Sequence, residues 1–141
     1  MKLFIDTGAF IALTDTDDEN HKAAVFFYQS SKEKGARFLT TNFVVCETMN
    51  YLRARISHQI AVFFWESLKK SGFVDIIPVN PFTEEGAFAI FKRYHDKDFS
   101  FTDCTSFSVM RALKLKKAFA FDKHFEQLED FGRLSPFPFP L

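Results

Sequence analysis

Four acidic residues lie beside or within apolar segments, where an isolated charge would be costly to bury. Asp6 follows KLFI, Glu47 interrupts FVVCETMNYL, Asp103 opens the segment DCTSFSVM, and Asp122 follows AFAF. A carboxylate in an apolar setting must be paired with a cation, bound to a metal or protonated. Carboxylates that share one pocket also repel one another, so a pocket formed by these four would require a cation.

The types of these side chains indicate which cation that would be. Carboxylate oxygens suit hard ions such as Mg²⁺ or Mn²⁺, whereas clustered Cys and His would indicate Zn²⁺. The four histidines show no metal-ligand spacing with Cys46 or Cys104. A hard ion in an acidic pocket activates water and neutralises charge during displacement at phosphate. We therefore expect Mg²⁺ (or Mn²⁺) and a phosphate ester, provided that the fold brings the acids together.

The hydrophobic pattern predicts strands that alternate with helices. We expect strands at 2–6, 36–41, 73–79 and 116–122, and helices at 21–34, 43–56, 57–71, 83–94 and from 102 onwards. Such alternation implies a mainly parallel sheet covered on both faces, a three-layer α/β/α sandwich. Ligands gather beyond the carboxyl ends of strands in open parallel sheets, and Asp6 and Asp122 follow two of the expected strands.

The other two acids are expected on helices. An acid in the first turn of a helix, such as Asp103, is stabilised by the helix dipole alone. Asp103 also shares one side of its helix with Phe107 and Met110, which should turn the carboxylate towards the buried side. Glu47 shares a helical row with Phe43, so it needs either a salt bridge or a metal.

The composition is that of one folded unit, which we expect to span residues 1–141. Of the 141 residues, 47% are hydrophobic and 21 are Phe, enough for a core. Eighteen basic residues balance eighteen acidic ones, which argues against a strongly basic nucleic-acid binder but not against a local basic patch. Two cysteines are too few for a disulfide framework, so we expect both to be buried and reduced.

Two further features concern the ends of the chain. The segment MKLFIDTGAF is interrupted by Asp6 and does not look like a signal peptide, and no apolar run approaches the roughly 18 residues of a membrane span. We therefore expect a cytoplasmic protein without a membrane segment. The tail SPFPFPL, with alternating Pro, is expected to be an extended edge or surface segment.

Four segments together resemble a known family. MKLFIDTGAF, FVVCE, FSFTDCTSFSVM and AFAFDKHF, in this order, are similar to the four acidic motifs of PIN-domain ribonucleases. The likeness is greatest to the VapC-type toxins of prokaryotic toxin–antitoxin pairs, whose sequence after the first motif also resembles DENHKAA. It extends from Met1 to about Leu134. The resemblance implies a small PIN-like parallel α/β sandwich with an acidic pocket above the sheet.

By position, the resemblance assigns a role to each acid. Asp6 and Asp103 match the principal metal-binding aspartates, while Glu47 and Asp122 match the acids that complete the pocket directly or through water. Two further residues have matches of their own. Thr7 corresponds to a Ser/Thr that supports a ligand or phosphate, and Thr102 precedes the third acid and would cap its helix.

His124 follows the last motif, and we interpret it as structural rather than catalytic. The implied reaction is hydrolysis of an RNA phosphodiester, which leaves 5′-phosphate and 3′-hydroxyl ends. The implied partners are an RNA substrate, an antitoxin protein and a second copy in a homodimer. Lysines available to contact RNA are Lys69, Lys70, Lys114, Lys116 and Lys117. Aromatic residues that belong either to the core or to a dimer or antitoxin surface are Phe63, Phe64 and Trp65.

One alternative stays open, namely a catalytically silent PIN-fold module that binds a protein partner through the same acids. A missing acid would favour that module, and all four are present. A small-molecule phosphatase with Asp6 as nucleophile is disfavoured, because Gly8 stands where the second aspartate of that pattern belongs. A phospho-acceptor receiver domain is disfavoured as well, since the last expected strand ends in acid rather than lysine.

Overall fold

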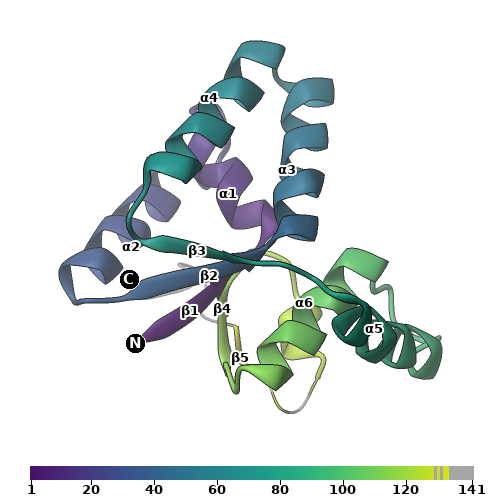
Figure 1. Cartoon of the computed structure of the whole chain (residues 1–141). Coiled ribbons are helices and arrows are strands. Elements are labelled where there is room, and N and C mark those ends of the chain that lie inside the picture. The colour runs from purple at the N-terminus through teal and green to yellow at the C-terminus, as the bar shows by residue number, and fades with distance from the viewer. Residues whose placement is uncertain (129, 131, 134–141) are drawn as a thin grey trace.

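Five parallel strands form the centre of the protein. The computed structural model describes residues 1–128, 130, 132 and 133. The strands are β1 (Lys2–Ile5), β2 (Arg37–Thr41), β3 (Val74–Ile77), β4 (Lys117–Phe119) and β5 (Gly132–Arg133), in the order β3-β2-β1-β4-β5 (Figure 1). Every pairing in this sheet is parallel, so the predicted parallel sheet is confirmed. The two-residue strand β5 was not predicted.

Helices cover both faces of this sheet. They are α1 (Thr7–Thr14), α2 (His21–Glu33), α3 (Asn42–Arg55), α4 (His58–Lys70), α5 (Pro81–Arg93) and α6 (Phe101–Ala112), followed by the short 3-10 helix η1 (His124–Glu126). Helices α1 to α4 lie on one side, and α5 and α6 lie on the other (Figure 1). The predicted three-layer α/β/α sandwich is therefore confirmed, with α1 as an additional helix.

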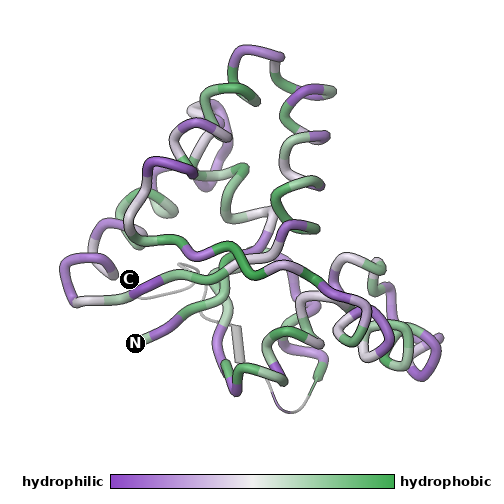
Figure 2. The backbone as a smooth tube through the Cα atoms, in the orientation of Figure 1, coloured by the Kyte–Doolittle hydropathy of each residue, from purple (hydrophilic) through white to green (hydrophobic). Residues whose placement is uncertain are grey.

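The central strands of the sheet lie in the hydrophobic core of the molecule. Leu3, Phe4 and Ile5 of β1 have no exposed surface, and Phe4 pairs with Leu39 of β2 and with Ala118 of β4. Because a central parallel strand is buried on both faces, its residues form a continuous hydrophobic run rather than an alternating one. Figure 2 shows this as green along the central strands, with purple concentrated on the outer turns of the helices.

Each of the predicted helices starts within two residues of its expected position, and α2 starts at His21 as predicted. The hydroxyl of Ser57 caps α4 and accepts from the Ile60 backbone nitrogen at 3.0 Å. Helix α3 begins one residue earlier than predicted, because the Thr41 hydroxyl caps it. Helix α5 is capped by Asn80 and starts with Pro81. Pro is well suited to this first position because its missing N–H has no helical partner there.

Helices α5 and α6 pack closely, and this contact fixes the position of α6 below the sheet. A Cβ atom on Gly86 of α5 would lie 2.6 Å from the Ser108 hydroxyl of α6, so the close approach needs a residue without a side chain. The same Ser108 hydroxyl donates to the Thr83 carbonyl at 3.1 Å. Helix α6, which carries Asp103, is thus held against α5 by backbone groups and small side chains where the two helices cross.

Three further predictions concern the two cysteines, the segment at 135–141 and the membrane-spanning character of the helices. Cys104 is buried as predicted, but Cys46 is exposed, because the buried side of α3 is formed by Val44, Val45 and Leu52 instead. The predicted extended segment SPFPFPL at 135–141 lies outside the described residues. In the part of the chain that is described, no helix has the length and apolar character needed to cross a membrane.

Candidate active site

Asp103 is held at the start of α6 by a reciprocal pair of hydrogen bonds. The Asp103 backbone nitrogen donates to the Ser100 hydroxyl, and the Ser100 backbone nitrogen donates to Oδ2 of Asp103, both at 3.0 Å. This capping box satisfies two backbone donors of the first turn and fixes the carboxylate. Ser100 therefore caps α6, and the prediction that Thr102 does so is wrong, since Thr102 is already inside the helix.

The side of α6 that faces the sheet is the one the sequence indicated. Asp103 is only 6% exposed, and Phe107 and Met110 on the same side have no exposed surface. Burial raises the pKa of the Asp103 carboxyl, and the nearby charges of Asp122 and Glu47 raise it further. The hydrogen bond from Ser100 and the neighbouring His124 act in the opposite direction. The net direction is upward because burial outweighs these two contacts.

Asp6 lies where β1 ends and α1 begins. It is 3% exposed, and a hydrogen bond from the Thr7 backbone lowers the pKa of its carboxyl without offsetting the opposing effects. Burial raises the pKa of Asp6 well above its ordinary value, and the charges of Asp122, Asp103 and Glu47 all raise it further. The three other predicted acids therefore lie close enough to Asp6 to repel it.

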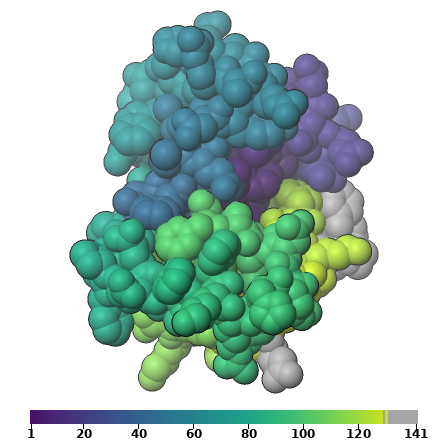
Figure 3. Space-filling view, turned by 90° about the vertical axis from the view of Figure 1, so that its right-hand side faces the viewer, coloured from purple at the N-terminus to yellow at the C-terminus, as the bar shows by residue number. Residues whose placement is uncertain are grey.

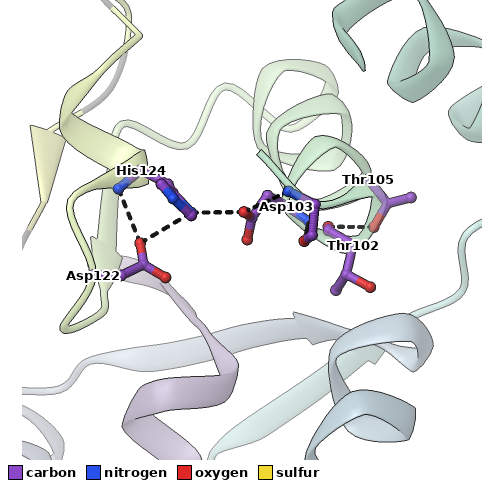
Figure 4. A network of polar contacts seen from close by, with 6 residues as sticks. Thr102, Asp103, Thr105, Asp122 and His124 are labelled. Atoms are coloured by element: carbon purple, nitrogen blue, oxygen red, sulfur yellow. Dashed lines mark hydrogen bonds and ion pairs between the residues drawn. The ribbon is translucent and has the colours of Figure 1, made fainter. Parts of the chain in front are cut away.

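Asp122 and His124 complete one side of this pocket. Nδ1 of His124 lies 2.6 Å from Oδ2 of Asp103 and 3.6 Å from Oδ1 of Asp122. The Asp122 carboxylate also accepts from the His124 backbone nitrogen at 2.9 Å. Figure 4 shows the imidazole between the two carboxylates. Ligand atoms of Asp103, Asp122 and His124 all lie within 4.8 Å of one another.

Glu47 approaches from α3 on the opposite side. It is half-buried beside a hollow of about 490 Å³, which is also lined by Phe43, Asn50 and Thr102. Its helical row is therefore at the edge of the core and not inside it, as the exposed Tyr51 on the same row confirms. Glu47 thus needs no buried salt bridge, and it lies near enough to Asp6 and Asp103 for its charge to raise the pKa of both carboxyls.

Comparison with known proteins identifies the family. The family model for the PIN domain matches residues 3–130. The chain belongs to the PIN-domain family. The 23S rRNA-specific endonuclease VapC20 of Mycobacterium tuberculosis is 33% identical over 123 residues, which cover 87% of this chain and 91% of that protein. A VapC ribonuclease of Archaeoglobus fulgidus is 33% identical over 135 residues, which cover 94% of this chain and 84% of that protein.

Solved structures agree with this PIN-domain assignment. The crystal structure of Mycobacterium tuberculosis VapC20, described as a sarcin-ricin loop cleaving toxin, matches with a TM-score of 0.78 and 31% identity, covering 86% of this chain and 90% of that one. The VapBC2 structure from Rickettsia felis has a TM-score of 0.72 at 9% identity, covers 96% of this chain and 98% of that one, and so shows the fold alone. The predicted PIN-domain ribonuclease of the VapC type is confirmed at the level of the family.

The pocket of this PIN-domain protein has the donor chemistry of a site for a divalent cation. The charged groups that shift the pKa of Asp6 are all acids, so their repulsion is unrelieved without a cation. The Thr7 hydroxyl adds a buried oxygen that has no hydrogen-bond partner among the described residues. Carboxylate oxygens such as those of Asp103 and Asp122, whose ligand atoms lie within 4.8 Å of each other and of His124, suit a hard ion.

Two features of the site escaped sequence reasoning. The structural role of His124 stays a prediction, but the position of its ring nitrogen within ion-pair distance of Asp103 and Asp122 was not foreseen. The signal was the short spacing in FDKHF, which leaves the imidazole beside the last acid of the series. Ser100 was overlooked because Thr102 also stands before Asp103, whereas the partners of a capping box lie three positions apart, with two residues between them.

Proposed function

We propose that this protein is a metal-dependent endoribonuclease that acts as the toxin of a VapBC-type toxin–antitoxin pair. The observation that carries the proposal is the grouping of ligand atoms of Asp103, Asp122 and His124 within 4.8 Å of one another, beside a buried Asp6 whose pKa is raised by Asp122, Asp103 and Glu47. The match to the PIN family over residues 3–130 supports our prediction of a single PIN-like unit acting on RNA. Its place of action would be the cytoplasm.

The four acids would divide the work of holding the cation. Asp6 and Asp103 are the most buried, so we assign them as principal ligands, with Glu47 and Asp122 as supporting ligands directly or through water. A bound Mg²⁺ or Mn²⁺ would supply activation of a water molecule and neutralisation of charge on the phosphate. Thr7, with its unpartnered hydroxyl, would orient a ligand oxygen or the scissile phosphate.

The remaining residues of the site would control orientation. The capping box at Ser100 keeps the Asp103 carboxylate aimed into the pocket before any ligand arrives. His124 holds Asp103 and Asp122 near each other through its ring and backbone nitrogens. Thr102 lines the hollow beside Glu47, where an RNA strand would pass between α3 and α6. Such preorganisation reduces the rearrangement needed when substrate binds.

An apolar groove among the helices α1, α2 and α4 supports the proposed protein partners. It has a volume of about 440 Å³ and is lined mainly by residues of α1, α2 and α4, including Phe10, Leu13, Val25 and Phe63. Phe63 is 62% exposed and Trp65 of the same helix is 43% exposed, whereas Phe64 between them is buried. An exposed apolar surface of this kind is typical of a protein interface. We propose it as the surface for an antitoxin or for a homodimer.

A digest of RNA tests the proposed function. Purified protein is incubated with total bacterial RNA, which includes the 23S rRNA cleaved by the related VapC20, in Mg²⁺, in Mn²⁺ or in EDTA. We expect discrete cleavage with either ion, none in EDTA, and products with 5′-phosphate and 3′-hydroxyl ends. Cleavage that persists in EDTA would contradict the role of the metal. No cleavage with either ion, together with tight binding to the product of a neighbouring gene, would favour the silent interaction module.

A further inference from the structure

A hollow lined by aromatic and basic side chains lies on the outer part of α5. Its volume is about 480 Å³, and its lining consists of Phe88, Phe91, Lys92, Tyr94, His95, Lys97 and Phe99. Phe88 is 52% exposed and Phe91 is 46% exposed, although both are large apolar rings. No acid is found among the described residues that line this hollow. We call it the α5 hollow.

The α5 hollow is next to the candidate active site. Its floor is the buried ring of Phe99, whose centroid lies 5.6 Å from that of His124. His124 in turn lies 2.6 Å from Asp103. On the other side, the Phe91 ring lies 6.0 Å from that of Phe101, in the first turn of α6. The rings of Phe99 and His124 therefore connect the hollow to the carboxylate of Asp103.

Helices α3 and α5 are both visible on one face of the molecule (Figure 3). Figure 3 shows α5 in green at the front, below α3 and α4 in blue. Dark purple atoms from the beginning of the chain are visible in the seam between these two blocks. The start of the chain, which includes Asp6, therefore reaches the surface between the block of α3 and α4 and the block that contains α5.

The basic side chains that line the hollow suit a polyanion, with the exposed acids Asp96 and Asp98 flanking Lys97 outside the lining. Lys92, His95 and Lys97 supply basic groups in a chain of zero formal net charge. Lys97 lies 4.0 Å from Asp96, whereas Lys92 has no ion pair with an acid among the residues described. By contrast, the groove between α1, α2 and α4 is mainly apolar and has Lys32 as its one basic lining residue in the described part of the chain.

We propose that the α5 hollow binds an unstacked base of single-stranded RNA next to the scissile phosphate. This inference rests on the proposed function. Phe88 and Phe91 provide the rings on which the base stacks, and Lys92 and Lys97 lie near the neighbouring phosphates. Exposed rings interleaved with cations are the usual means by which proteins bind single-stranded nucleic acid. The mainly apolar groove between α1, α2 and α4 is better suited to a protein partner.

Binding of a labelled oligonucleotide tests the proposal. The probe is a fluorescein-labelled, unstructured 16-nucleotide RNA of mixed sequence, measured by anisotropy with Asp103→Asn protein so that it is not cut. We expect Phe88→Ala to weaken binding roughly 5- to 100-fold, the effect of losing one base–ring stack, and Phe88→Tyr to restore it. Lys92→Gln should reduce the slope of log affinity against log salt by about 0.7.

Matched controls separate the hollow from the rest of the surface. Phe82 lies on the same helix, is 85% exposed and does not line the hollow, so Phe82→Ala should leave affinity within about twofold. In the otherwise wild-type protein with Mg²⁺, Phe88→Ala should raise KM for the RNA by a similar factor and change kcat little. Circular dichroism of each variant excludes loss of the fold.

The outcomes distinguish this inference from the proposed function. Phe88→Ala protein that binds and cleaves RNA like the wild type would overturn the α5 hollow while leaving the nuclease intact. The same result, joined by loss of a dimer in light scattering, would reassign the hollow to a protein interface. Wild-type protein that binds RNA through Phe88 but cuts none would support the hollow and refute the nuclease. Absence of any RNA binding would refute both.

Discussion

At the scale of residues, the site is a set of carboxylates whose charges are poorly compensated within the protein. Sequence alone was enough to select Asp6 and Asp103, because acids beside buried strands and on the apolar side of a helix are costly. It could not show that Glu47 lies at the edge of the core and is only half-buried, because residue spacing along a helix does not reveal where the core ends. It also could not show His124 beside Asp103, because that contact depends on how the chain turns after β4.

The raised pKa of Asp6 predicts how stability depends on pH. At low pH the carboxyl is protonated in both states, and the folded protein has its full stability with respect to this group. As pH rises through the raised pKa of the folded state, the buried carboxyl must ionise and that stability is lost. Asp6→Asn removes this loss, so the metal-free variant should be more stable than the wild type at pH 7–8.

Thermal melting in EDTA at two pH values measures this effect. A gain of about 1 kcal/mol, ordinary for one substitution, would raise Tm by roughly 2–4 °C at neutral pH and should shrink below about pH 4. Asp98→Asn is the matched control, because Asp98 is exposed and does not contribute to the shifts at Asp6 or Asp103. An Asp6→Asn variant that is less stable than the wild type at neutral pH would contradict the claim that, without a metal, the other acids repel a charged Asp6.

At the scale of elements, the prediction succeeded for long patterns and failed for short signals. Four strands were found from their apolar runs, but the two residues of β5 carry no such pattern. Helix starts were displaced where neighbouring polar residues compete, as with Thr41 beside Asn42. There the side chain of Asn42 instead accepts from the Val79 backbone nitrogen at 2.8 Å, a contact between distant segments that local propensity cannot reveal.

The capping box of α6 predicts a cost for removing its hydroxyl. Ser100→Ala leaves the Asp103 backbone nitrogen without its acceptor and should lower the free energy of unfolding by about 0.5–2 kcal/mol. Ser100→Asn, which can still cap, should lose much less. Chemical denaturation measures both variants, and Ser100→Ala should also bind Mn²⁺ more weakly because Asp103 is less restrained. Equal stabilities of Ser100→Ala and the wild type would show that the cap does not hold α6.

At the scale of the whole molecule, the proposed metal would join two layers of the sandwich. Asp6 leads into α1 on one side of the sheet, while Asp103 belongs to α6 on the other. Alternation of strands and helices predicted these layers, since parallel strands need crossover helices. It did not predict which helices cover which face or the strand order β3-β2-β1-β4-β5, because these depend on contacts between distant segments.

A ligand that joins the layers should stabilise the entire fold. Mg²⁺ or Mn²⁺ at about 100 times its dissociation constant would add roughly 2.7 kcal/mol, which corresponds to several degrees in Tm. Asp103→Asn should lose this increase, whereas Asp98→Asn should keep it. NaCl matched in ionic strength is the control for screening. A rise in Tm of the same size in Asp103→Asn protein would place the bound cation elsewhere.

The central claim is that the buried carboxylate of Asp103 is part of a metal-dependent site that cuts RNA. Its most direct test is the rate of RNA cleavage by Asp103→Asn protein with Mg²⁺ or Mn²⁺, beside wild-type and Asp98→Asn protein, after circular dichroism has shown all three to be folded. We predict that Asp103→Asn abolishes cleavage and that Asp98→Asn retains the wild-type rate. Cleavage by a clean preparation of folded Asp103→Asn protein at a rate near that of the wild type would contradict the account.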